Sequence, residues 1–130
     1  MATIKRFTDI AAWQKGRELV NEIYRLTGAG AFAKDWGLKD QIQRAAVSIC
    51  SNIAEGFERS GNKEFANFLW TAKGSTGEVA SQLYHALDAH YISQEVFDDL
   101  QMRLSLISAI LYKLIQSMKD SSFTGQRYRT

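Results

Sequence analysis

A pair of glutamates, both histidines and the single cysteine are the residues that could do chemistry in this 130-residue chain. Glu55 and Glu78 fall on neighbouring expected helices and could meet as paired carboxylates, the arrangement that general acid–base catalysis uses. His85 and His90 are five residues apart, so they lie on different faces of a helix. Helical bundles build di-iron sites from paired Glu-x-x-His motifs, and the sequence contains none. We therefore expect no metal and no cofactor.

Nucleophilic catalysis has no support from the spacing of the serines or the cysteine. Ser48 and Ser75 have no histidine partner at a helical spacing. Cys50 stands among apolar residues, where a thiol behaves as a small buried hydrophobe. The segment GSTGE at 74–78 lacks the longer glycine frame of a phosphate loop, and small residues that allow close packing explain it better. Each glutamate of the possible pair is better explained as the partner of an arginine, so we expect no enzyme.

A polar stripe runs along the second expected helix, beside its apolar row. At about 100° per residue, five polar residues fall within a sector of roughly 80°. They are Arg44, Ser48, Asn52, Glu55 and Arg59. A solvated face would not need amide, acid and base in one line. We therefore expect these residues, together with Glu78, to form a shielded polar network where the second and third helices meet each other or a neighbouring subunit.

Composition predicts one soluble helical domain that spans residues 1–130. The chain is 45% hydrophobic and 23% charged, as is ordinary for globular proteins. It contains no proline, the residue that breaks helix interiors. Its apolar stretches are interrupted well before the roughly 18 residues of a membrane span, and the amino terminus lacks the apolar run of a signal peptide. We therefore expect a cytoplasmic protein that does not bind membranes.

Apolar residues recur at helical spacing in four segments, followed by a polar tail at 121–130 that we expect to be flexible. The predicted helices cover residues 9–27, 35–59, 62–89 and 93–119, with N-caps at Thr8, Asp35 and Ser93. The expected core row of the first helix is Ile10, Trp13, Val20, Ile23 and Leu26. That of the fourth helix is Val96, Leu100, Leu104, Ile107, Leu111, Leu114 and Met118. Short connections favour an all-α, antiparallel up-down-up-down four-helix bundle.

The third predicted helix carries a second row opposite its core row: Trp70, Gly74, Gly77, Ser81 and Tyr84. Two aromatic residues frame a floor of small residues, where another backbone can approach closely. One interpretation is a pair of half-exposed aromatics on a helix that tolerates glycine. We favour a contact with another helix or subunit, because each glycine costs about 1 kcal/mol relative to alanine. Extra apolar surface also occurs on the second helix, at Ala46, Val47, Cys50 and Ala54, and on the fourth, at Met102, Leu106 and Ile110. This surplus predicts a ring-like homo-oligomer.

The net charge of +2 is too small to dictate a nucleic-acid partner by itself. The positive residues concentrate in the first helix and the tail. The candidate phosphate contacts are Lys5, Arg6, Lys15, Arg17, Arg25, Arg127 and Arg129. Scattered basic residues are also typical of a solvated face. We expect any binding to RNA to be weak, salt-dependent and indifferent to sequence.

An ordered set of motifs covers roughly residues 7–118. It consists of Trp13-Gln14, Arg44-Ala45-Ala46-Val47-Ser48-Ile49, Ser51-Asn52-Ile53-Ala54-Glu55-Gly56, Arg59, Lys63-Glu64-Phe65, Phe68-Leu69, Ala72, Gly74-Ser75, Glu78 and Leu83. With these motifs the chain resembles the family of small four-helix-bundle proteins encoded within intervening sequences of bacterial 23S ribosomal RNA genes. The resemblance implies an antiparallel bundle, a homo-oligomer that is a pentameric ring, and no established enzymatic activity. A related bundle is the accessory protein of diversity-generating retroelements, where a basic ring works with a reverse transcriptase and RNA; this chain is nearly neutral.

Three functions are therefore weighed. The first is a non-enzymatic oligomeric scaffold or accessory protein that associates with RNA or a nucleic-acid-processing partner. The second is a protein–protein interaction module that uses the surface of Trp70 and Tyr84 and binds no nucleic acid. The third, an enzyme with a site at Glu55 and Glu78, ranks last.

Overall fold

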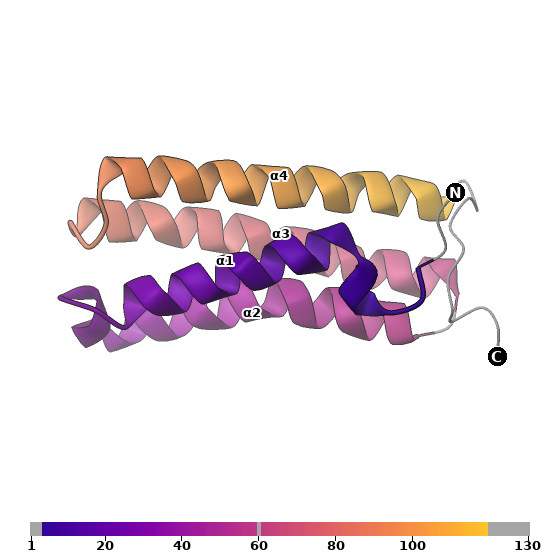
Figure 1. Ribbon diagram of the computed structural model, residues 1–130, viewed down its shortest axis with the longest axis horizontal. Helices are drawn as coiled ribbons and strands as arrows, with labels where there is room; N and C mark the ends of the chain where they lie inside the picture. Colours follow the sequence, from indigo (N-terminus) through magenta and orange to yellow (C-terminus); the bar gives the residue numbers. More distant parts are fainter. Residues whose placement is uncertain (1–3, 60, 120–130) are drawn as a thin grey trace.

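Four α-helices form the bundle in the computed structural model, which describes residues 4–59 and 61–119. They are α1 (Ala11–Thr27), α2 (Trp36–Glu58), α3 (Asn62–Asp88) and α4 (Gln94–Lys119), with short 3₁₀ turns η1 (Phe7–Asp9) and η2 (Phe32–Lys34). Successive helices run in opposite directions (Figure 1), and the described residues contain no β-strand. The predicted all-α, up-down-up-down bundle is confirmed, whereas the tail at 121–130 lies outside the described residues. None of the described helices has the length and hydropathy that crossing a bilayer requires.

Buried apolar side chains from all four helices form one core cluster. The largest side chains with less than 2% exposure are Phe65, Leu19, Ile23, Ile42, Ile49, Ile53, Leu69, Leu83, Leu100, Ile107, Leu111 and Ile115. Each such side chain stabilises the fold by about 1.5–3 kcal/mol relative to exposure to water. The bundle is therefore held together by the apolar stripes that the sequence carries at helical spacing.

Two of the predicted N-caps are confirmed by hydrogen bonds. The carboxylate of Asp35 accepts a bond from the backbone N–H of Leu38 at 3.2 Å and another from the Tyr91 hydroxyl at 2.8 Å. The second bond ties the start of α2 to the segment between α3 and α4. Ser93 Oγ accepts from the backbone N–H of Val96 at 3.1 Å.

The predicted N-cap at Thr8 is wrong. The carboxylate of Asp9 accepts bonds from the backbone N–H groups of Arg6 at 3.2 Å and Lys5 at 3.3 Å. These bonds close the η1 turn at Asp9, so α1 begins only at Ala11, with Ile10 as its N-cap. An acidic side chain that we expected in the first turn of the helix instead stabilises the turn before it.

The expected core rows of α1 and α4 are also partly wrong. In α4, Phe97 and Ile115 are buried, whereas their neighbours Val96 and Leu114 are only partly buried. At Leu114, the seven-residue spacing from Ile107 drifts relative to the 3.6 residues per turn of a straight helix, which bring Ile115 to the core face. In α1 the buried residues are Ala12, Gly16, Leu19, Ile23 and Thr27, and Trp13, Val20 and Leu26 are partly buried.

The extra apolar ridge on α2 is used inside the chain. Ala46 is fully buried, and Cys50 lies against Gly16 of α1, where an added Cβ would come within 2.8 Å of the sulfur. Packing within the chain therefore accounts for Ala46 and Cys50 without a second subunit, whereas Val47 is 37% exposed. The ridge on α4 differs, because Met102 is 64% exposed and Leu106 is 48% exposed.

Candidate functional site

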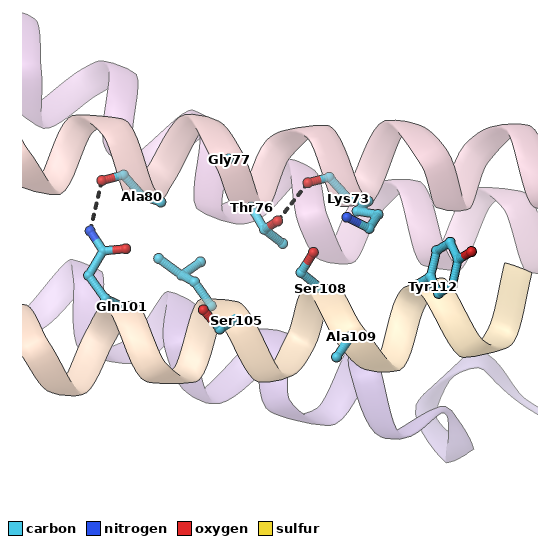
Figure 2. A pocket seen from close by; sticks show the side chains of 10 residues that line it. Lys73, Thr76, Gly77, Ala80, Gln101, Ser105, Ser108, Ala109 and Tyr112 are labelled. Atoms are coloured by element: carbon cyan, nitrogen blue, oxygen red, sulfur yellow. Dashed lines mark hydrogen bonds between the residues drawn. The ribbon is translucent and has the colours of Figure 1, made fainter.

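A groove of about 550 Å³ lies between α3 and α4 near the middle of the bundle (Figure 2). It is lined by Lys73, Thr76, Gly77, Ala80, Gln101, Leu104, Ser105, Ser108, Ala109 and Tyr112. Small residues and hydroxyls form most of this lining. Gln101 Nε2 donates a hydrogen bond to the carbonyl of Ala80 at 2.9 Å, which links α4 to α3. We call this site the α3/α4 groove.

Aromatic pairs connect α3 to α4 at both ends of the α3/α4 groove. The rings of Trp70 and Tyr112 meet edge to face at 6.2 Å between centroids, and those of Tyr84 and Phe97 do so at 4.8 Å. Trp70, Tyr84 and Tyr112 nevertheless remain 44%, 56% and 47% exposed. The two aromatics that the sequence indicated therefore lean onto α4 without being covered.

The small residues between Trp70 and Tyr84 face outward. Gly74, Gly77 and Ser81 are all exposed. A Cβ added at either glycine would have no heavy atom of the described chain within 4 Å. No contact within the described chain therefore explains why α3 carries glycine here, and the predicted interface at these five residues stays a prediction.

Sequence reasoning missed the half of the groove that α4 supplies. Ser105, Ser108, Ala109 and Tyr112 line it at i, i+3, i+4 and i+7 spacing. That pattern places three small residues and one aromatic on one helix face. On the α3 side, the row that the sequence indicated shares only Gly77 with the lining, and Lys73, Thr76 and Ala80 were also missed.

The predicted polar network divides into separate groups within the chain. At the α2/α3 seam, the hydroxyls of Ser48 and Ser75 are hydrogen-bonded at 2.9 Å. Asn52 Nδ2 donates to the carbonyl of Ser48 at 2.8 Å and to its hydroxyl at 2.9 Å. Ser75 is only 4% exposed, so these bonds satisfy polar groups at the edge of the core.

The charged members of the predicted network lie at the surface. Arg59 pairs with Glu55 at 2.6 Å, and the two side chains are 47% and 52% exposed. Arg44 pairs with Asp40 at 3.0 Å, and its side chain is 79% exposed. Ion pairs this exposed contribute about 0–1 kcal/mol. The chain alone thus does not shield the network, and its burial by a neighbouring subunit stays a prediction.

Glu55 and Glu78 do not form a carboxylate pair. Ser48 of α2 lies opposite Ser75 of α3. From this level, Glu55 lies seven residues toward one end of the bundle, and Glu78 lies three residues toward the other end. At 1.5 Å per residue, about 15 Å along the bundle separates the two carboxylates. No hydrogen bond or ion pair between described residues joins Glu78 to the other members of the network. The arrangement that acid–base catalysis would need is absent from these two positions.

Burial keeps the Cys50 thiol in its neutral form. Desolvation raises its pKa to about 11, and its sulfur lies 3.6 Å from the carbonyl oxygen of Trp13. A nucleophilic cysteine needs a thiolate, which this environment disfavours. Across residues 4–59 and 61–119, no group of three His, Cys, Asp or Glu side chains is placed to hold a metal ion.

The predicted cationic residues do not form one patch. Lys5, Arg6, Lys15 and Arg17 lie at and near the start of α1, and all four are exposed. Arg25 lies at the opposite end of α1, where its Nε donates to Glu22 at 3.0 Å and this hydrogen bond lowers the pKa of the Glu22 carboxyl. Arg127 and Arg129 fall outside the described residues.

Residues 8–113 match the family described as 23S rRNA-intervening sequence protein. The chain belongs to this family. Its fold is similar to the crystal structure of a protein of unknown function from the S23 ribosomal protein family of Bacteroides thetaiotaomicron, with a TM-score of 0.74 and 23% sequence identity. The similarity covers 82% of this chain and 99% of that one. No protein with a curated description matches the sequence. The family that the motifs indicated is thus confirmed, together with its helical fold.

Proposed function

We propose that this 23S rRNA-intervening sequence protein is a non-enzymatic scaffold or accessory protein that assembles with copies of itself and associates with RNA or an RNA-processing partner. The resemblance implies a ring of five copies. The observation that supports association with RNA is the separation of charge along the bundle.

Basic residues gather in one half of the bundle and acidic residues in the other. The half that holds the start of α1 and the end of α4, which we call the positive half, comprises residues 4–18, 47–59, 61–75 and 107–119 (Figure 1). It contains nine Lys or Arg and five Asp or Glu. The negative half, residues 19–46 and 76–106, contains five basic and eight acidic residues. A nearly neutral chain thereby carries a local excess of positive charge that can attract phosphates.

Four of the candidate phosphate contacts lie in the positive half, namely Lys5, Arg6, Lys15 and Arg17. Arg25 lies in the negative half and is bound to Glu22, so it is not part of the proposed RNA surface. A ring whose copies all point the same way would gather their positive halves at one rim. Assembly would then multiply a field that one chain supplies only weakly.

The test compares two double variants that change net charge equally. Lys5→Gln with Lys15→Gln removes two cations from the positive half, and Lys34→Gln with Lys39→Gln removes two from the negative half. Binding of a fluorescein-labelled RNA hairpin is followed by anisotropy over a range of salt concentrations. We expect the first variant to bind more weakly and to lower the slope of log K against log salt by about one to two, because each lost phosphate contact removes released counterions.

The control variant should keep the wild-type slope. Equal losses in both variants would show that net charge, and not the positive half, attracts RNA. A wild-type protein that does not bind the hairpin even at low salt would overturn the RNA association and favour the second function, a protein–protein interaction module. The observation behind that alternative is the number of large exposed apolar side chains, with Trp36 at 76% and Met102 at 64%.

A further inference from the structure

We propose that the α4 ridge of one copy, formed by Met102 and Leu106, packs onto the glycine face of α3 in the next copy, formed by Gly74, Gly77 and Ser81. This contact rests on the proposed self-assembly and names the surfaces that carry it. The two surfaces lie on different helices of each chain, so each copy gives one surface and receives the other.

The glycine face is shaped to receive a protruding side chain. Gly74 and Gly77 have open space where a Cβ would stand, and Ser81 continues the row as a small residue. Trp70 and Tyr84 stand exposed at the two ends of the row. The result is a shallow uncharged floor between two aromatic walls, a hole for which the described chain supplies no knob.

The α4 ridge has the complementary shape. Met102 and Leu106 are one helical turn apart, and both protrude with about half or more of their surface exposed. Methionine adapts to irregular apolar surfaces because its side chain is flexible and unbranched. The α4 ridge is a protrusion with no partner in the described chain, and the glycine face is a hollow with no partner there. Because both occur on the same chain, a second copy is the occupant that fits both.

The two surfaces also lie at the same height along the bundle. Gln101 is bonded to Ala80, and Tyr112 touches Trp70, which sets the level of α4 against α3. Met102 and Leu106 fall between these levels, beside the glycine face. A ring closes by rotation without a shift along its axis, so copies that stand parallel to the axis must touch at equal height. A ridge displaced along the bundle would build a filament instead.

Lys113 extends the proposed contact between the α4 ridge and the glycine face toward the end of α4. Lys113 is exposed, lies on the same face as Leu106 two turns further along the helix, and has no ion pair among the described residues. Its level is close to that of Trp70, because Trp70 touches the adjacent residue Tyr112. In the proposed contact, the ammonium of Lys113 reaches the exposed indole of the neighbouring Trp70, a favourable cation–π pairing.

Crosslinking between two different variants tests the pairing of surfaces. Both variants carry Cys50→Ala, which removes the single native thiol. One adds Leu106→Cys, the other adds Gly77→Cys together with a mass tag, and a short bismaleimide is the crosslinker. We expect crosslinked pairs of mixed mass when the two variants are combined, and little crosslinking within either variant alone.

Each other result of the mixing experiment has a definite meaning. Crosslinks within the Leu106→Cys variant alone would overturn the proposal in favour of a two-fold contact between like surfaces. Multiple copies by light scattering without mixed crosslinks would overturn this contact but leave self-assembly intact. A wild-type mass equal to one chain would overturn both, whereas the RNA binding of the positive half is measured separately and would stand.

A matched pair of substitutions gives a second readout. Gly77→Arg places a large cation on the glycine face, and Gly37→Arg makes the same change at an exposed glycine of α2, where an added Cβ would meet only Asp35 Oδ1, at 4.0 Å. With the helical circular dichroism signal preserved, we expect Gly77→Arg to reduce the mass by light scattering to a single chain and Gly37→Arg to keep the wild-type mass. A folded Gly77→Arg variant of unchanged mass would place the contact on another face.

Discussion

The glycines that lie where helices meet inside the chain are enclosed, unlike those on the outer face of α3. A Cβ added to Gly56 of α2 would come within 2.6 Å of Phe68 Cβ and 3.0 Å of Phe65 Cδ1. A Cβ added to Gly16 of α1 would come within 2.8 Å of the sulfur of Cys50. These two glycines therefore let α2 approach α3 and α1 approach α2 more closely than any larger residue would allow.

On the outer face of α3, Gly74 and Gly77 have no such neighbours within the described chain. The same residue type thus serves two purposes, and only the surroundings of each position tell them apart. An enclosed glycine sets the distance between two helices of the chain. A glycine on an open helix face costs about 1 kcal/mol relative to alanine, and it allows a partner outside the chain to approach the helix backbone closely.

The largest effect is expected at Gly56. In Gly56→Ala the new methyl group collides with Phe68 Cβ, an atom that no change of rotamer can move, so the backbones of α2 and α3 must separate. We expect a loss of about 1–3 kcal/mol in the free energy of unfolding, even though alanine favours the helix. Urea denaturation measures it, and a variant as stable as the wild type would show that α2 and α3 do not depend on this closeness.

A smaller effect, with a built-in rescue, is expected at Gly16. Its added methyl group meets the Cys50 sulfur, which belongs to a small side chain on a helix. Gly16→Ala should lower the free energy of unfolding by about 1–2 kcal/mol. Cys50→Ala in the same chain removes the sulfur and should restore part of that loss. A double-mutant cycle measures the coupling, and strictly additive effects would mean that the two residues do not press on each other.

Helix faces and caps were predictable because they depend on neighbours in sequence. A buried stripe repeats every 3.6 residues, and a side chain such as Asp35 caps a helix through a bond three residues away. The errors also have local causes. Asp9 was expected to begin the first helix, but its carboxylate accepts hydrogen bonds from the backbone N–H groups of Lys5 and Arg6, which precede it. Val96 and Phe97 are both apolar, so their order in the sequence cannot tell which one faces the core.

Little of the candidate site was predictable, because the site depends on how the helices are set against one another. The pairing of Ser48 with Ser75 fixes the level of α2 against α3. The periodicity within one helix does not determine its position along the bundle axis relative to another helix. The sequence alone was therefore compatible with a contact between Glu55 and Glu78. The outward row on α3 needed no such knowledge, since a face opposite the core row points away from the core in any bundle.

The smallest effect, and the one of opposite sign, is expected at Gly77. In Gly77→Ala the methyl group enters open space on an exposed helix face, so only helix propensity changes within the chain. We expect the free energy of unfolding to rise by up to about 1 kcal/mol when it is measured at concentrations where single chains prevail. The same methyl group stands where we propose that a neighbouring Leu106 packs, so the mass measured by light scattering at a fixed higher concentration should fall. A rise in stability with unchanged mass would mean that Gly77 faces open space in the assembly as well. Gly77 would then differ from Gly56, because neither a helix of the chain nor a second copy would need the close approach that glycine allows.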